Sequence, residues 1–361
     1  MSACSASPRP PPRPALSERL RRLVRERPGD LAAAVLLAVL LTWILPPLFR
    51  WAVLDATFFG ESKAACQGGG ACWAIVTSRW RQVLAGFYPE GHLWRVAVAA
   101  LCLFAGLLPA LSRRTIALTP LVAPLGVVAA FGVMGGAGLL PRAPSDYWGG
   151  FFLNFLIGVA ASVFALPIGI ALALGRLSRL PVVKGLSVAF IELVRGAPLI
   201  VLLFAAAVVA PLFTPQGVTF DKLTRAMIVI TLFEAAYMAE AVRGGLLGVP
   251  AGQAEAARAL GLDPVRAFAL VVAPQALRIA TPALVNSFIG LFKDTSLIYV
   301  IGILDVTGVL RNAVTDFAWQ GLETEAYVFV AVLFWIVCFS LSRWSAGLER
   351  RSAAPKREPA P

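Results

Sequence analysis

A run of polar residues interrupts an otherwise apolar stretch of the sequence. Lys293, Asp294, Thr295 and Ser296 lie within residues 276–301, a segment long enough to cross a membrane. An ionisable side chain in such a segment is costly, so it marks a solute pathway or a pair with another group. A zwitterionic solute needs one group for its carboxylate and another for its ammonium. These residues are therefore pathway candidates, with local unwinding of the helix expected. A structural polar network between helices is the alternative.

Three further sets of charges lie in or beside apolar segments. Glu192 and Arg195 are three residues apart and share a helical face, as do Glu240 and Arg243. We expect each pair either to form a structural salt bridge at a helix end or to contribute to a gate. Glu234 lies in mid-segment with no basic residue at helical spacing. It either faces the pathway and binds an ammonium group, or it is buried and protonated.

The sequence contains no constellation that supports catalysis. It lacks the GxxxxGK[ST] loop that cradles ATP phosphates. Its single histidine, His92, and the absence of a Cys/His cluster argue against a metal site. We therefore predict a protein that is not an enzyme and has no cofactor of its own, so that chemistry must come from a partner.

The composition predicts a protein whose natural solvent is lipid. Of 361 residues, 58% are hydrophobic and 14% are charged, and the mean hydropathy is +0.78. Soluble domains have roughly 45–50% apolar and about 25% charged residues, so this much apolar surface does not fit one water-soluble core. About eight segments are long and apolar enough to cross a bilayer. They are residues 31–51, 94–112, 116–140, 150–174, 193–213, 224–242, 276–301 and 325–343.

The segments fall into two groups, which predicts an all-α membrane protein with two modules. Residues 150–345 carry five spans and form the predicted core. Residues 31–145 carry about three spans and form an N-terminal extension that precedes it. The Pro- and Arg-rich residues 1–30 are predicted to be a disordered basic arm, and residues 346–361 a polar tail.

Basic residues follow every second span, and this pattern predicts the topology. Short basic loops mark the cytoplasmic side, which places both termini and residues 243–275 in the cytoplasm. The pattern also accounts for the net charge of +12, so no nucleic-acid partner is implied. Residues 52–92 form an outer, periplasmic loop that contains Cys66 and Cys72. On this oxidising side the two cysteines either form a disulfide or remain free thiols.

Residues 243–275 have an unusual pattern for a connecting loop. Residues 251–260 are almost all strong helix formers, and Gly261 then breaks the helix. Asp263 caps a second helix, with proline at its first position, and we expect Pro274 to end that helix at the membrane edge. The loop either packs on the protein's own membrane base or, because its side chains are small, fits a groove of another protein.

The same loop resembles the signature of importer permeases of the ATP-binding-cassette (ABC) type. That signature reads EAA, three residues, Gly, nine residues and then Ile-x-Leu-Pro, with Val271 and Ala273 here in place of the Ile and the Leu. In that family the segment is a coupling helix that docks into a cytoplasmic ATPase dimer, where Mg-ATP is bound. The matching residues are Glu255, Ala256, Ala257, Gly261 and Pro274.

Further segments resemble the polar amino-acid permeases of this type, and nearly the full length resembles the M subunit of the broad-specificity L-amino-acid permease. The resemblance implies a multi-pass subunit of the bacterial inner membrane that takes up L-amino acids. It also implies a periplasmic binding protein and a sister permease in a heterodimer. The segments are residues 45–48, 71–73, 94–96, 192–199, 213–223, 237–245 and 292–297.

The competing hypothesis is a secondary amino-acid transporter driven by an ion gradient. Such a protein would keep charged residues within its spans. It would have no need of the helix–Gly–helix loop in residues 243–275, and this loop therefore favours the ABC-type permease.

Overall fold

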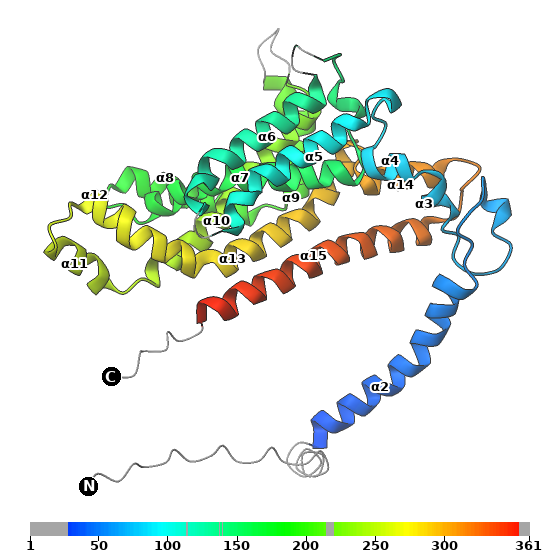
Figure 1. Cartoon of the computed structure of the whole chain (residues 1–361), viewed down its shortest axis with the longest axis horizontal. Helices are drawn as coiled ribbons and strands as arrows, with labels where there is room; N and C mark the ends of the chain where they lie inside the picture. Colours follow the sequence, from blue (N-terminus) through cyan, green and yellow to red (C-terminus); the bar gives the residue numbers. More distant parts are fainter. Residues whose placement is uncertain (1–27, 113–114, 137, 139, 214–219, 354–361) are drawn as a thin grey trace. The chain divides into compact units, whose positions relative to one another are not determined.

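The structure, a computed structural model, describes residues 28–112, 115–136, 138, 140–213 and 220–353 (Figure 1). Within these residues the regular structure is helical apart from isolated β-bridges, so the predicted all-α class is confirmed. Residues 1–27 of the predicted arm and 354–361 of the predicted tail lie outside the described residues. The α-helices are α2 (Pro28–Phe49), α3 (Ala74–Ser78), α4 (Trp80–Ala85), α5 (Trp94–Leu107), α6 (Thr119–Gly135), α7 (Gly150–Arg176), α8 (Pro181–Gly196), α9 (Leu199–Phe204), α10 (Lys222–Leu247), α11 (Ala251–Ala259), α12 (Pro264–Ala267), α13 (Ala273–Asp294), α14 (Val306–Thr315) and α15 (Glu323–Ala353).

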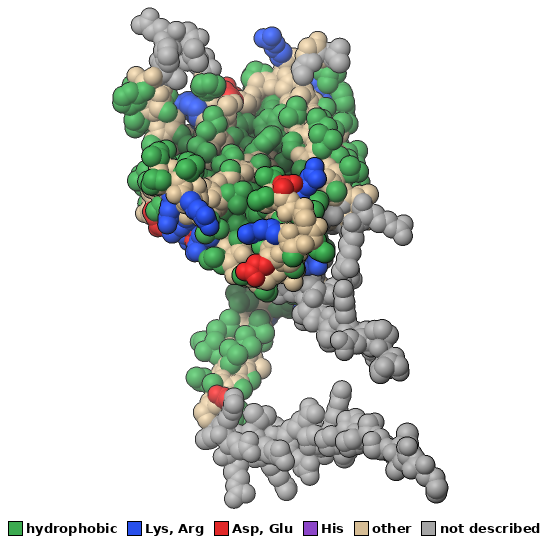
Figure 2. All heavy atoms as spheres, turned by 90° about the vertical axis from the view of Figure 1, so that its left-hand side faces the viewer, with side chains coloured by type: hydrophobic (Ala, Val, Ile, Leu, Met, Phe, Trp, Pro, Cys, Tyr) green, Lys and Arg blue, Asp and Glu red, His purple; other side chains and the backbone are tan. Residues whose placement is uncertain are grey.

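Each of the eight predicted spans coincides with helical residues, but fewer than eight helices meet the requirements of a span. Among the described residues, five helices are long and apolar enough to cross a membrane, or six if one bent pair counts as a span. Helix α6 has 17 residues and is short for a crossing, and α10 carries several charges. Large hydrophobic side chains are exposed on most of the helices, as expected for a surface in contact with lipid, and Figure 2 shows some of them beside charged side chains at the end that carries α11 and α12.

The chain divides into two compact units, Met1–Ala74 and Ile75–Pro361. The second unit is built around α7 and α10, which pack on each other, with α13 against α10 and the α5–α6 hairpin against α7. Close approach depends on small residues. A Cβ at Gly169 of α7 would lie 3.0 Å from the Ala235 carbonyl oxygen of α10, and a Cβ at Gly245 of α10 would lie 2.3 Å from the Ala276 carbonyl oxygen of α13.

The boundary between the units falls at Ala74–Ile75, whereas the sequence places the end of the N-terminal extension near residue 145. Helices α5 and α6 therefore belong to the same unit as the predicted core. Their hairpin is tight because Gly126 of α6 faces Gly106 of α5, where a Cβ would come within 2.9 Å of the opposing Cα.

The predicted span over residues 193–213 is not one regular helix. Residues up to Gly196 belong to α8, and the helical run Leu199–Phe213 leaves it at an angle of 100°. Proline has no N–H to continue the helix and disfavours helical backbone in the residue before it. Ala197 accordingly has the extended angles φ −98° and ψ 138° before Pro198.

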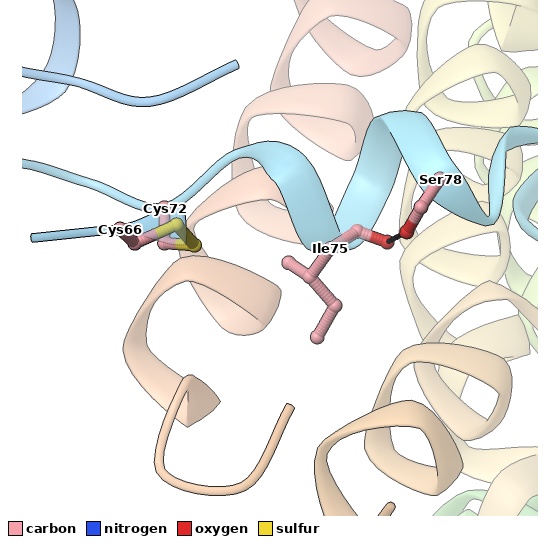
Figure 3. The surroundings of a disulfide bond; sticks show 4 residues. All are labelled: Cys66, Cys72, Ile75 and Ser78. Carbon is pink, nitrogen blue, oxygen red and sulfur yellow. Dashed lines mark hydrogen bonds between the residues drawn. A yellow bond between two sulfur atoms is a disulfide. The ribbon is translucent and has the colours of Figure 1, made fainter. Parts of the chain in front are cut away.

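The first unit consists of α2 and the loop that follows it. Cys66 and Cys72 are joined by a disulfide (Figure 3). The indole Nε1 of Trp73 donates a hydrogen bond of 2.7 Å to the Ala52 carbonyl oxygen, and the Thr57 N–H donates to the Ala71 carbonyl oxygen at 2.8 Å. These contacts bring the end of the loop back to the end of the helix, so residues 52–74 form a closed structure.

The neighbouring glycines Gly244 and Gly245 allow a test of the α10–α13 contact. Gly245→Ala should lower the free energy of unfolding by about 1–3 kcal/mol, because a methyl group would be forced against the backbone of α13. Nothing lies within 4 Å of a Cβ at Gly244, so Gly244→Ala is the matched control and should keep or raise stability. Thermal unfolding of the purified protein in detergent measures both, and equal stability of the two variants would refute the close contact.

Candidate functional sites

The loop in residues 243–275 folds as two helices separated by a glycine. Helix α11 ends at Ala259, and Gly261 has a positive φ of +84°, a conformation that side-chain-bearing residues rarely adopt. The Asp263 carboxylate accepts hydrogen bonds of 3.0 Å from the N–H groups of Val265 and Arg266, which caps α12. In Figure 1 α11 and α12 stand at one end of the second unit.

The expectation that Pro274 ends the second helix is wrong. Residues Phe268–Val272 form a π-helical turn, and α13 follows, with Pro274 as its second residue. Proline has no N–H for the hydrogen bond to the preceding turn, and the π-helical turn just before Pro274 is the place where the helix departs from regular α geometry. Residues Pro264–Ile301 therefore form one continuous helical run of 38 residues, on the order of 60 Å at about 1.5 Å per residue.

The signature residues occupy different environments within the loop. Ala257 is buried, while Glu255 and Ala256 are exposed on α11. The Gln275 Nε2 atom donates to Gln253 Oε1 at 3.2 Å, which ties α11 to the start of α13. The exposed residues thus form a surface on a helix that is anchored at one side.

A network of charges joins α7, α8 and α10 at the end of the unit that carries α11. Glu240 lies at its centre, with a side chain that is 18% exposed. Its carboxylate accepts from Arg243 Nη2 at 2.9 Å and from Arg176 Nη1 at 3.1 Å, and Arg195 Nη1 lies 4.0 Å away. Figure 2 shows basic and acidic side chains together on this face.

The expected pairing of Glu192 with Arg195 is wrong. Glu192 accepts a hydrogen bond of 2.8 Å from Arg176 of α7, whereas Arg195 lies over the ring of Tyr237 at 5.1 Å. The pairing of Glu240 with Arg243 is confirmed. Sequence reasoning missed Arg176, which it treated as a topology signal. The available signal was the position of Arg176 at the end of a predicted span, where a charged side chain can reach those of the helices packed beside it.

Of the pathway candidates, Glu234 and Asp294 lie within electrostatic range of each other, while Lys293 is exposed on the surface. Glu234 is 3% exposed, and its Oε1 atom has no hydrogen-bond partner among the described residues. Asp294 at the end of α13 is close enough to interact with it electrostatically. Lys293 is exposed, as expected if neighbouring helical residues point in different directions.

The helix changes character at the polar run, and Thr295 and Ser296 turn away from one another. The α-helix ends at Asp294, and residues Thr295–Ile301 form a 3-10 helix. The Thr295 hydroxyl is fully buried, donates to the Phe292 carbonyl oxygen at 2.7 Å and accepts from Asn154 Nδ2 at 3.1 Å. The Ser296 hydroxyl donates to the Lys293 carbonyl oxygen at 2.8 Å. Thr295 therefore belongs to a polar network between helices.

That network is centred on Asn154 of α7, which sequence reasoning missed. Asn154 Nδ2 donates to Asp305 Oδ2 at 3.0 Å, and Asn154 Oδ1 accepts from the Val306 N–H at 3.2 Å. Asp305 in turn caps α14 by accepting from the Gly308 N–H at 2.8 Å. Burial raises the pKa of the Asp305 carboxyl to about 6, although these hydrogen bonds oppose the shift. The network holds α14 on α7 and on the end of the long helical run.

The fold and these sites define a multi-pass membrane protein. It has a helical loop, α11 and α12, at one end and a network of paired charges on α7, α8 and α10 at the same end. The profile of the family described as "Binding-protein-dependent transport system inner membrane component" matches residues 165–353. The chain is 42% identical to the inner membrane amino-acid ABC transporter permease protein YhdY of Escherichia coli, over 94% of this chain and 96% of the relative.

Two further proteins are similar to the chain. It is 40% identical to the glutamate/glutamine/aspartate/asparagine transport system permease protein BztC of Rhodobacter capsulatus, over 86% of this chain and 87% of that protein. A solved structure, described as an amino acid ABC transporter with histidines, matches with 28% identity and a TM-score of 0.50. The match covers 56% of this chain and 91% of that one.

The chain belongs to the family of inner membrane components of binding-protein-dependent transport systems. It is a permease subunit of the inner membrane with several spans and is not an enzyme. The resemblance to ABC-type permeases is confirmed. The alternative of an ion-driven secondary transporter is wrong, because the relatives and the solved structure are named as parts of ABC transporters.

The charge network can be tested at Glu240. Glu240→Gln should lower the free energy of unfolding by about 1–2 kcal/mol, because the half-buried Arg243 loses its charged partner and Arg176 keeps only Glu192. The exposed pair Arg81–Glu90, at 52% and 79% exposure, is the control, and Glu90→Gln should change stability by less than about 0.5 kcal/mol. Equal effects in thermal unfolding would show that the network does not hold the helices together.

The buried amide can be tested in the same assay. Asn154→Leu should lower the free energy of unfolding by at least about 2 kcal/mol, because the Asp305 carboxylate and the Val306 N–H both lose a buried hydrogen-bond partner. Asn312 on α14 is exposed, and Asn312→Leu is the matched control. If Asn154→Leu is as stable as Asn312→Leu, the network does not fix α14.

Proposed function

We propose that the chain forms part of the membrane pathway of an ATP-driven importer of several L-amino acids. A sister permease would complete the pathway as a heterodimer, a cytoplasmic ATPase dimer would bind Mg-ATP, and a periplasmic binding protein would deliver the solute. The relatives support the substrate class, since two of them are named for amino acids and one of these for four different ones. Both termini and the loop in residues 243–275 would be cytoplasmic.

The observation that carries the proposal is the exposed helix α11 joined to one long helical run. Glu255 and Ala256 would contact the ATPase, Ala257 would pack α11 on its own chain, and Gly261 would set the angle between α11 and α12. Because Pro264–Ile301 is continuous, closure of the ATPase on ATP would shift the run together with the loop. A partner that binds the loop differently in its two states is what changes the equilibrium between permease states.

The charge network is suited to act as the cytoplasmic gate. It lies at the α11 end and joins α8 to α7 and α10 through Glu192, Arg195 and Glu240. Opening the pathway at this end would require these salt bridges to break. The free energy needed would come from the ATP-driven movement of the loop.

Glu234 and Asp294 are suited to bind the ammonium group of the solute. Both carboxyl groups lie within the apolar part of the unit, and Glu234 has an oxygen without a hydrogen-bond partner in the described residues. A cation that passes between them would be attracted by both. Lys293 and Ser296 would meet the solute, or the sister permease, on the more exposed side of the same helix. Thr295 would support this arrangement through Asn154.

Reconstitution tests the proposal as a whole. The permease, its sister subunit and the ATPase are placed in proteoliposomes with Mg-ATP inside and a loaded binding protein outside. We expect uptake of radiolabelled L-glutamine and L-glutamate that depends on ATP and persists when ionophores collapse the ion gradients. Uptake that continues without ATP or without the ATPase would contradict the proposal.

The coupling role can be tested at Gly261. Gly261→Val should reduce ATP-dependent uptake at least about tenfold without loss of membrane insertion, because a β-branched residue strongly resists a φ of +84°. Gly252 on α11 has open space around a Cβ, and Gly252→Val is the matched control that should retain most of the uptake. Unchanged uptake by Gly261→Val would remove the coupling role from this turn.

A further inference from the structure

Arg311 borders a pocket at the end of the second unit opposite to α11, where α14 lies in Figure 1. The pocket has a volume of about 370 Å³ and is lined by Tyr299, Val300, Leu304, Gly308 and Arg311. This volume lies within the range of about 300–1,000 Å³ that is usual for small-molecule sites. Apart from Tyr299 and Arg311, the lining side chains are apolar or absent.

Arg311 has no acidic partner in the described residues. Its guanidinium carbon lies 5.5 Å from the centre of the Tyr299 ring, and its Nη1 atom is 3.5 Å from the Tyr299 hydroxyl. Glu323 lines a narrow cleft on the other side of Arg311 but forms no ion pair with it. Apart from the long hydrogen bond from Nη1 to the Tyr299 hydroxyl, the guanidinium donors of this exposed side chain have no acceptor in the described residues and can bind an anion.

The walls of this pocket are held in place by the buried network of Asn154. Asp305 caps the helix on which Gly308 and Arg311 lie. Tyr299 and Val300 belong to the 3-10 helix that begins with Thr295, the hydroxyl of which accepts from Asn154. The Asn154 side chain binds both the start of the 3-10 helix and the residue that caps α14. Arg311 and Tyr299 therefore keep their relative positions without a ligand, and such preorganisation favours binding.

We propose that Arg311 and Tyr299 form a binding site for the α-carboxylate of the transported amino acid at the outer entrance of the pathway. A guanidinium binds a carboxylate through two parallel hydrogen bonds, while the apolar wall of Val300 and Leu304 accommodates side chains of different kinds. The site would receive the solute from the binding protein. This inference rests on the proposed import function.

Uptake by variants of Arg311 gives the first test. In the reconstituted transporter with saturating binding protein, Arg311→Gln should lower the maximal rate of L-glutamine uptake about tenfold or more. Arg311→Lys, which keeps the charge but not the paired donors, should be intermediate. The affinity of the complex for the binding protein should not change. If Arg311→Gln weakens that affinity in proportion, the site binds a carboxylate of the binding protein, and the proposal is overturned.

Thiol labelling gives a test of location. In a chain with Cys4, Cys102 and Cys338 changed to serine, Val300→Cys in the pocket wall should react with a small methanethiosulfonate reagent. Excess L-glutamine should slow this reaction severalfold, L-glutaminamide, which lacks the carboxylate, should not, and the protection should disappear with Arg311→Gln. Asn312 is exposed on the same helix as Arg311 but outside the pocket lining. The labelling rate of Asn312→Cys should therefore be unchanged by L-glutamine and by L-glutaminamide.

The outcomes separate this site from the import function itself. If the parent transporter takes up L-glutamine with ATP while Arg311→Gln is as fast, or Val300→Cys labelling is equal with and without L-glutamine, the carboxylate site is wrong and the import function stands. If the parent shows no ATP-dependent uptake, the proposed function fails before the site is tested.

Discussion

The close approach of α10 to α7 and α13 is the contact on which the other features depend. Gly169 and Gly245 leave room for the backbone of the neighbouring helix, and any side chain there would separate the three helices. Because α10 is held between its neighbours, Glu240 reaches Arg176 of α7 and Glu234 is buried near Asp294 of α13. In lipid, where apolar burial drives helix association only weakly, such tight packing is one of the main contributions to helix association.

One helical run connects the two ends of the second unit. The run Pro264–Ile301 begins within the loop in residues 243–275 and ends with the 3-10 helix in which Thr295 accepts a hydrogen bond from Asn154. The π-helical turn at Phe268–Val272 is the place where the run departs from regular geometry. In the proposed mechanism, displacement of the loop in residues 243–275 reaches the opposite end of the unit through this run.

The helical segments and the loop could be predicted from the sequence because each depends on local signals. Apolar length locates the helical segments, although not the number that qualify as spans, while Gly261 and Asp263 determine the helix break and the cap. The partners of charged residues could not be predicted in the same way. Glu192 pairs with Arg176 because the chain turns back after α7 and α8 packs against it, a contact between helices that no spacing within α8 indicates. Likewise, the contact between Asn154 and Asp305 joins residues 151 positions apart, for which the sequence carries no spacing rule.

The central claim is that the long helical run moves as one body with the loop. Distances between spin labels test this most directly. Val265 and Asn286 lie on the run, on either side of the π-helical turn, and Val182 lies on α8. All three are exposed, Val265 at 75% and Val182 at 71%, so each tolerates a label. We predict that the distance between Val265 and Asn286 is the same in the ATP-free and ATP-bound transporter, while the distance between Val265 and Val182 changes. A change between Val265 and Asn286 with a constant distance to Val182 would show that the run bends, and would contradict the account.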